Sequence, residues 1–197
     1  MTTPHMCGAW TLGALLAVVG CQSPDPAAPA PDAPPSSARV LPLDTADVQG
    51  VDRVVARIEP VGGDGVRGTV RLLRAEGGVR VTAELEGLSA SEYHGLQVLR
   101  GRDCGASPAV HLGAESGAPH GGPYSLPGER HAGDLGNVRG DRGRGRYDRI
   151  DPVLRLSGTG SAVGRAVVVR ASRDDAASPD GAAGAVIGCG VLEPADR

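Results

Sequence analysis

The stretch VRGTVRLLRAEGGVRVTAELE, residues 66–86, carries the clearest secondary-structure pattern in the 197-residue chain. From Val79 onwards, apolar and polar residues alternate with a period of two, which places one set against a core and the other in water. The first nine residues of the stretch form a second strand candidate. Between the two, Gly77 and Gly78 can supply the positive φ angles of a tight turn. The stretch therefore predicts an antiparallel β-hairpin.

Short segments of the same kind continue on both sides of this hairpin. The aromatic content is 2% with no Phe, so a core must be built from Val, Leu, Ile and Ala, and β-branched residues favour strands. Strands at short spacing, joined by Gly-rich turns, predict an all-β antiparallel sandwich or barrel. The predicted strands are residues 51–59, 66–74, 79–86, 95–99, 153–156, 164–170 and 185–192.

The N-terminal residues have the pattern of an export signal. Residues 7–20, CGAWTLGALLAVVG, are apolar but shorter than the roughly 20 residues that a membrane-spanning helix needs. They end in Val18-Val19-Gly20-Cys21, which resembles a bacterial lipobox, where the cysteine is lipidated. An ordinary cleaved signal is the alternative. We expect an exported lipoprotein on the periplasmic or cell-surface side, held to the membrane by a lipid on Cys21.

The composition divides the chain into three regions. Residues 22–49 are rich in Pro, Ala, Ser and Asp and offer too little apolar surface to fold, so they are expected to form an extended tether. The predicted division is a lipoprotein signal segment at residues 1–21, the disordered tether at 22–49 and a β-barrel domain at 50–193.

The charge of the chain argues against nucleic-acid binding. Its formal net charge is -3, whereas nucleic-acid binders carry a basic surplus. Residues 139–149, RGDRGRGRYDR, are rich in Arg and Gly, but Asp141 and Asp148 interrupt the basic run. A solvated strand and turn is the prediction for this segment, with a nucleic-acid patch as the alternative.

Two of the four cysteines lie in the body of the predicted domain. An even pair in an exported protein favours a disulfide, because thiols oxidise and stay oxidised outside the cytosol. Two free buried thiols are the alternative. The two residues are Cys104 and Cys189.

Two predicted connections, residues 100–135 and 171–184, are long for a compact domain, and loops of that length are usually functional or disordered. The first contains three histidines and an aspartate, a set that suits tetrahedral zinc in a closed structural site. The spacing alone does not identify zinc, and solvent-exposed histidines in a Gly-rich loop are the alternative. The candidate ligands are His111, His120, His131 and Asp134.

The segment RHAGDLGNV, residues 130–138, closely resembles the end of the zinc loop in the Cu/Zn superoxide dismutases. The resemblance covers roughly residues 54–192 and keeps the family's motifs in order. It implies an eight-stranded antiparallel Greek-key β-barrel with a zinc loop and an electrostatic loop. The other matching segments are HGGP at 120–123, LSG at 156–158, GRAVVV at 164–169, DD at 174–175 and GCGV at 188–191.

The resemblance also implies roles for single residues. His111 matches the histidine that bridges copper and zinc, and the other three candidate ligands match the remaining zinc ligands. Asp174 matches the carboxylate that orients metal-binding imidazoles, which need an acceptor on their other nitrogen. Cys104 and Cys189 match the pair that ties the metal loop to the barrel. His94 matches a separate structural histidine of the family.

Three of the four copper-ligand positions hold other residues. Gln97 and Leu99 stand where the family has two histidines on one strand, and Arg170 stands where it has the fourth ligand. Leucine has no lone pair, and an arginine side chain is always protonated and cannot bind a cation. Val186 occupies the place of the family's anion-guiding arginine. The sequence therefore predicts zinc as the cofactor and argues against copper.

These substitutions predict a pseudoenzyme, because dismutation needs a metal that changes oxidation state and zinc does not. We hypothesise that Arg170 fills the former copper space near Gln97 and Asp174, and that His111 is an ordinary neutral zinc ligand. The favoured function is a structural or binding module of the cell envelope that contacts the membrane through its lipid. An envelope zinc buffer and an active superoxide dismutase are the alternatives. The sequence leaves the protein partner open, and a homodimer is compatible with the resemblance.

Overall fold

The computed structural model describes residues 50–63, 65–106 and 109–195. The predicted signal segment, the tether and the lipidation site Cys21 lie outside these residues. The regular secondary structure of the described part consists of β-strands, with one 3-10 helix, η2, at Ala114–Ser116. The strands are β1 (Arg53–Pro60), β2 (Arg67–Ala75), β3 (Gly78–Glu86), β4 (Tyr93–Val98), β5 (Asp134–Arg139), β6 (Arg144–Asp151), β7 (Ala166–Arg170), β8 (Val186–Val191) and β9 (Glu193–Pro194).

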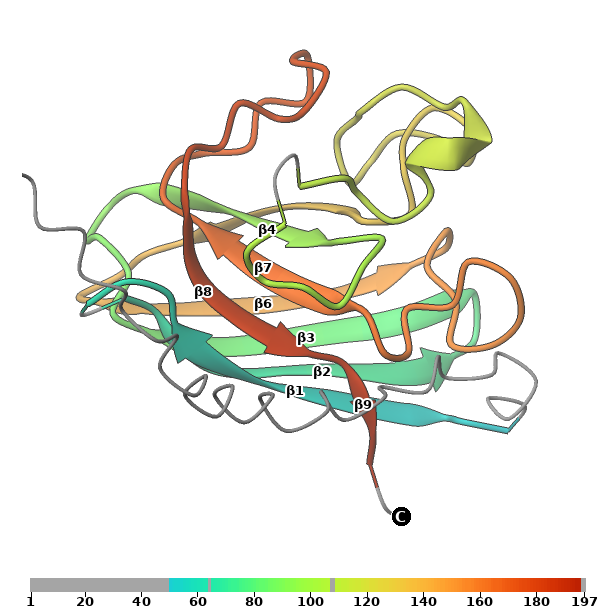
Figure 1. Cartoon of the computed structure of the whole chain (residues 1–197), viewed down its shortest axis with the longest axis horizontal. Coiled ribbons are helices and arrows are strands. Elements are labelled where there is room, and N and C mark those ends of the chain that lie inside the picture. The colour runs from blue at the N-terminus through green and yellow to red at the C-terminus, as the bar shows by residue number, and fades with distance from the viewer. Residues whose placement is uncertain (1–49, 64, 107–108, 196–197) are drawn as a thin grey trace, which may run out of the picture. The chain divides into compact units, whose positions relative to one another are not determined.

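The strands form one antiparallel sheet that curls into a nearly closed barrel (Figure 1). The strand order is β5-β4-β7-β8-β1-β2-β3-β6, and the short β9 pairs with β1. The β3–β6 and β4–β7 neighbours are not consecutive in sequence, as Greek-key crossovers require. Strands β5 and β6, at the two ends of the order, lie against each other without pairing. The predicted eight-stranded antiparallel barrel is confirmed.

The predicted hairpin is the pair β2–β3. Its register runs from Arg67 opposite Glu86 to Ala75 opposite Gly78, and Gly77 and Gly78 have φ angles of 82° and 147°. A Cβ atom at Gly78 would lie 2.1 Å from the carbonyl oxygen of Asp151, so only glycine fits there. The inward faces of these strands supply the aliphatic core that the composition predicts. Its members from the hairpin are Val70, Leu72, Val79, Val81, Ala83 and Leu85.

The predicted strand at residues 153–156 is wrong. This segment follows Pro152, which has no backbone N–H to donate. The carboxylate of Asp151 accepts the backbone N–H groups of Val153 and Leu154, both at 2.9 Å, so they are not available to a neighbouring strand. Leu154 and Leu156 are nevertheless buried. The apolar residues correctly indicated that this segment is buried, but the segment does not pair with another strand.

Strand β6 lies in the Arg/Gly-rich segment, where a solvated strand and turn was expected, and that prediction is confirmed. Strand β5 begins at Asp134, inside the stretch predicted to be a loop, and was missed. In this part of the chain, Gly and charged residues interrupt the apolar alternation, so only the tertiary pairing with β4 defines the strand.

The two long connections are residues 99–133 and 171–185, close to the expected ranges. They lie on the same side of the barrel (Figure 1), and a hydrogen bond from His120 in the first to Asp174 in the second joins them. A disulfide between Cys104 and Cys189 ties the first connection to β8, which confirms the predicted bond. Such a cross-link typically stabilises a fold by about 2–4 kcal/mol. No helix in the described residues is long and apolar enough to cross a membrane.

Candidate metal centre

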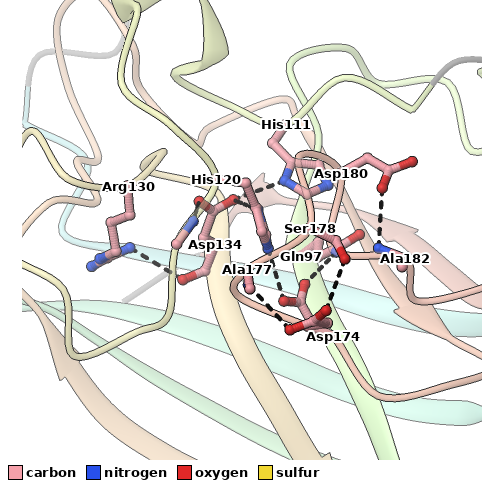
Figure 2. Close-up of polar contacts among 12 residues, drawn as sticks. Gln97, His111, His120, Arg130, Asp134, Asp174, Ala177, Ser178, Asp180 and Ala182 are labelled. Atoms are coloured by element: carbon pink, nitrogen blue, oxygen red, sulfur yellow. Dashed lines mark hydrogen bonds and ion pairs between the residues drawn. The ribbon is translucent and has the colours of Figure 1, made fainter.

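The structure brings the four candidate ligands, which span 24 positions of sequence, into one cluster. One ligand atom from each of them lies within 4.8 Å of the others. The oxygen Oδ1 of Asp134 is 2.8 Å from Nδ1 of His111, 3.1 Å from Nδ1 of His120 and 3.3 Å from Nδ1 of His131. Figure 2 shows the rings of His111 and His120 converging on this carboxylate. All three histidines therefore present the same nitrogen to one point.

The cluster is closed to solvent. The four residues are between 0% and 8% exposed. The Nδ1 atoms of His120 and His131 have no hydrogen-bond partner, although buried polar atoms nearly always have one. Two unpartnered nitrogens beside a carboxylate oxygen are what a missing cation would leave behind. The N₃O donor set fits zinc in a structural site with no open position.

The local chain geometry explains why these side chains meet. Asp134 is the first residue of β5, and its second oxygen accepts the backbone N–H groups of Gly121 (3.0 Å) and His131 (2.8 Å). These bonds fix the carboxylate before any metal binds. His111 is held in place by a bridge between its backbone and Leu99, just beyond the end of β4. The loop thus folds back on the barrel at both ends of the ligand set.

Asp174 forms a second layer around the cluster. Its Oδ1 accepts a hydrogen bond from Nε2 of His120 at 2.9 Å, which leaves Nδ1 of that ring free to bind a metal. Its Oδ2 accepts one from Nε2 of Gln97 at 2.5 Å. The backbone of Asp174 is paired in both directions with the side chain of Asn137 on β5, at 2.7 and 3.0 Å. Asp174 therefore links β4 and β5 to the candidate metal centre. Figure 2 shows Asp174 beside Gln97 and His120.

Arg130 is a supporting residue for which the sequence predicted no role. It is 2% exposed and its guanidinium donates to Asp151 at 2.6 Å. The other terminal nitrogen donates to the carbonyl oxygens of His131 (3.1 Å) and Asp134 (3.2 Å), so Arg130 holds the turn between two candidate ligands. A buried pair of this kind costs roughly 3–5 kcal/mol to break, because the remaining charge is left unpaired.

The three positions that match copper ligands have different environments. Gln97 is fully buried on β4, and its Oε1 has no hydrogen-bond partner. Leu99 is 1% exposed and packs in an apolar cluster with Val168 and Cys189. Arg170 is half-buried at the end of β7, and its Nε is buried without a partner.

The stem of Arg170 lies beside Asp174. The Cγ atom of Arg170 and the Cβ atom of Asp174 are each 3.2 Å from the point that a Cβ atom on Gly95 would occupy. Burial lowers the pKa of Arg170, and the carboxylates of Asp180 and Asp174 oppose that shift. His94 is not a member of the cluster. Its ring is hydrogen-bonded instead to the backbone of Ser89 and of Arg170.

In the metal-free cluster, neighbouring side chains shift the pKa values of His120 and Asp134. Burial lowers the pKa of His120, but the neighbouring carboxylates of Asp134 and Asp174 outweigh it and raise the pKa to about 9. Burial raises the pKa of Asp134, but the adjacent rings of His111 and His120 outweigh it and hold the pKa far below its usual range. Without a metal, the site therefore carries a proton on His120 at neutral pH, opposite an ionised Asp134.

Fold and site together define an antiparallel β-barrel protein with a buried three-histidine, one-aspartate metal-binding cluster. The family model described as copper/zinc superoxide dismutase (SODC) matches residues 66–192. The chain belongs to this family, as its sequence motifs predicted.

Individual relatives agree with that assignment. A "Superoxide dismutase [Cu-Zn]" of Paramecium bursaria Chlorella virus 1 is 35% identical over 137 residues, which cover 64% of this chain and 72% of the relative. "Superoxide dismutase [Cu-Zn] 2" of Brassica juncea is 36% identical over 141 residues, covering 66% and 90%. The crystal structure of the clock protein EA4 superposes with a TM-score of 0.64 at 31% identity, covering 73% of this chain and 95% of that one.

Proposed function

We propose that this protein is a zinc-binding member of the dismutase family that has lost catalysis and serves as a binding module of the cell envelope. One observation carries the proposal. Four ligand atoms of the zinc type converge in a buried cluster, whereas the three remaining copper-ligand positions hold a glutamine, a leucine and an arginine. The chemistry of these donors favours a closed zinc site and no redox metal beside it.

The candidate zinc site also supports a structural role for the ion. The three histidines come from one connection and Asp134 begins β5, while Asp174 of the other connection is hydrogen-bonded to His120. A metal bound there would join both loops to the barrel. Because the site is buried and offers four protein ligands, zinc exchange would be slow, which suits a structural ion better than an envelope zinc buffer.

The envelope role rests on the N-terminal sequence. Cleavage before Cys21 and lipidation of its thiol would place the barrel at the end of a Pro-rich tether outside the cytoplasm. Labelling with a radioactive or clickable fatty acid in a bacterial host tests this step. Label that persists in a Cys21→Ser variant would contradict lipidation at this position.

Metal content is the direct test of the proposed function. The full chain, oxidised and offered copper and zinc together, is expected to retain about one zinc and no stoichiometric copper after dialysis, as measured by elemental analysis. The virus dismutase, loaded in parallel, controls for the loading procedure. Stoichiometric copper in this chain, or dismutase activity that rises with copper content, would overturn the pseudoenzyme assignment and support the alternative of an active superoxide dismutase.

Zinc binding is expected to depend on pH through His120. Its pKa of about 9 means that zinc displaces a proton at neutral pH. Apparent zinc affinity should therefore rise about tenfold per pH unit between pH 7 and pH 9, and level off above pH 9 as this proton is lost. Chelator competition across this range measures the slope. A flat profile from pH 7 to pH 9 would contradict the coupling.

The raised pKa of His120 also affects the stability of the metal-free protein, which should fall as pH rises. A histidine whose pKa is raised in the folded state stabilises that state below its unfolded pKa of 6.5, and the contribution is lost as pH rises through about 9. The metal-free form should therefore lose stability from pH 6.5 to pH 9, whereas the zinc-loaded form should not. Thermal melts of both forms provide this comparison.

A further inference from the structure

The turn that joins β5 to β6 carries a basic groove that the candidate metal centre does not use. The groove has a volume of about 670 Å³, which is within the usual range for small-molecule sites. Four arginines and one aspartate line it, although the whole chain has a formal net charge of -3. The lining residues are Arg139, Asp141, Arg142, Arg144, Gly145 and Arg146.

Most of this positive charge is not neutralised by neighbouring side chains. Among the residues that the structure describes, Arg144 forms an ion pair with Glu86 at 3.5 Å, between two largely exposed side chains. Such an exposed pair contributes little. Glu84, which lies opposite Arg146 in the β3–β6 register, is paired instead with Arg71. Within the same described part of the chain, no ion pair involves Arg139, Arg142 or Arg146.

The backbone presents these arginines in a fixed arrangement. Asp141 and Arg144 exchange both backbone hydrogen bonds, at 2.6 and 2.8 Å, around a two-residue turn. Arg142 has a φ of 48° in this turn, where asparagine or glycine is the usual choice. A left-handed conformation costs a side-chain-bearing residue about 1–2 kcal/mol.

The turn is also anchored to the barrel. The backbone N–H groups of Gly87 and Leu88 both donate to the carbonyl oxygen of Gly143, at 2.8 and 3.2 Å. At the bottom of the groove, a Cβ atom on Gly145 would lie 2.4 Å from Cδ1 of Leu88 and 2.6 Å from Cγ1 of Val138. Glycine thus lets β6 approach β5 closely where the two strands do not pair. The arginines are mounted on a rigid support, which limits the entropy lost on binding.

We propose that this groove binds a compact, multiply charged phosphate group. The guanidinium fork matches phosphate oxygens in pairs, and three uncommitted arginines around one groove can contact one diphosphate-sized anion. A long polyanion gains less beyond the groove, because the neighbouring arginines on the outer face of the sheet, Arg71 and Arg80, are already paired with Glu84 and Asp148. The phosphate can belong to a soluble compound or to a lipid headgroup, and the two sources are distinguished experimentally.

In the test, inorganic pyrophosphate is titrated into the zinc-loaded full chain at low ionic strength, and binding is measured by calorimetry. We expect saturable one-to-one binding that weakens as salt is added, since the site is exposed. The double variant Arg142→Asn/Arg146→Gln keeps the turn, because asparagine tolerates the left-handed conformation. It should weaken binding at least about tenfold, because each lost guanidinium removes charge-assisted hydrogen bonds.

The matched control is Arg53→Gln/Arg57→Gln on β1, which removes the same charge from exposed positions that β2 and β3 separate from β6. It should change the affinity less than twofold. Zinc content measured after each titration verifies that pyrophosphate has not extracted the metal. If the control and the groove variant weaken pyrophosphate binding equally, the proposal is overturned. The loss of affinity would then follow from the lower net charge of the protein and not from the groove.

A second arm uses vesicles of phosphatidylcholine with phosphatidic acid, whose phosphomonoester headgroup can carry two negative charges. Binding to them that the groove variant loses assigns the phosphate to a lipid headgroup, whereas binding of pyrophosphate alone assigns it to a soluble compound. The proposal is overturned if neither probe binds, or if a poly-aspartate peptide binds more tightly than both. None of these outcomes depends on whether copper or zinc occupies the metal centre.

Discussion

Asp134→Asn is expected to lower zinc affinity by a factor on the order of 1,000. Structural zinc contributes roughly 10–16 kcal/mol of binding free energy in small domains, or about 2.5–4 kcal/mol for each of four ligands, and the anionic ligand is expected at the upper end of that range. Asp134 supplies the only anionic ligand of the four, and its Oδ1 lies within 3.3 Å of all three Nδ1 atoms. The amide is neutral and cannot balance the charge of the ion. Competition against a chromophoric zinc chelator gives the ratio of the two affinities.

The control for this substitution is Asp141→Asn, the same chemical change at an exposed aspartate in the β5–β6 turn. It should leave the zinc affinity unchanged. The Asp134→Asn variant should also melt at the same temperature with and without zinc, whereas the parent should be stabilised by the metal through mass action. An affinity close to that of the parent would show that the four converging atoms are not the zinc site.

The sequence predicted the parts of this molecule that depend on local pattern. The β2–β3 hairpin follows from alternation and two glycines, and the candidate metal ligands follow from residue type within one loop and from the family resemblance. The strand predicted at residues 153–156 failed because a side chain intervened. Asp151 takes the backbone N–H groups that a ladder would need, and apolar spacing carries no information about such a competitor.

The contacts that support the candidate metal centre could not be predicted from sequence patterns. Arg130 lies within the best-matching motif, yet its partner Asp151 is 21 residues away on β6. Asn137 stands in the same motif and pairs with Asp174, which is 37 residues further along the chain. A single sequence gives no signal for such pairs, since their spacing follows no periodicity. Both pairs form only when the fold brings a long connection against a strand, Arg130 against β6 and Asp174 against β5.

Gln97 can keep the hydrogen bond that a histidine at this position would make, without keeping its ability to bind a metal. A histidine at this position could donate one ring hydrogen to Asp174 and offer the other nitrogen to a metal. The amide of Gln97 keeps a donor to Asp174, at 2.5 Å, and is a poor metal ligand. The link between β4 and the zinc-type cluster is therefore preserved without copper. The support of the cluster therefore does not require a histidine at this position.

The triple variant Gln97→His/Leu99→His/Arg170→His is expected to bind copper in addition to zinc, changing the copper content from about zero to about one ion per chain. Copper(II) binds more tightly than other divalent first-row metals to nitrogen ligands, so a site of four imidazoles should hold it firmly. The backbone of Leu99 is bridged to His111, and Arg170 and Gln97 both flank Asp174, so new rings at these positions start close to one another. Elemental analysis and the visible spectrum of copper(II) measure the outcome.

The single variant Arg170→Gln separates two physical causes that would each disfavour copper binding, the positive charge and the missing imidazoles. It removes the half-buried positive charge but adds no imidazole, so it should bind no stoichiometric copper. If it does bind copper, electrostatic repulsion by the guanidinium is the main barrier and the missing ligands matter less. If the triple variant keeps its zinc and its melting temperature but takes up no copper, these three positions do not account for the loss. In that event the cause would lie in the shape of the barrel around Leu99, whose apolar packing against Val168 and Cys189 leaves the new ring no room to turn toward the ion.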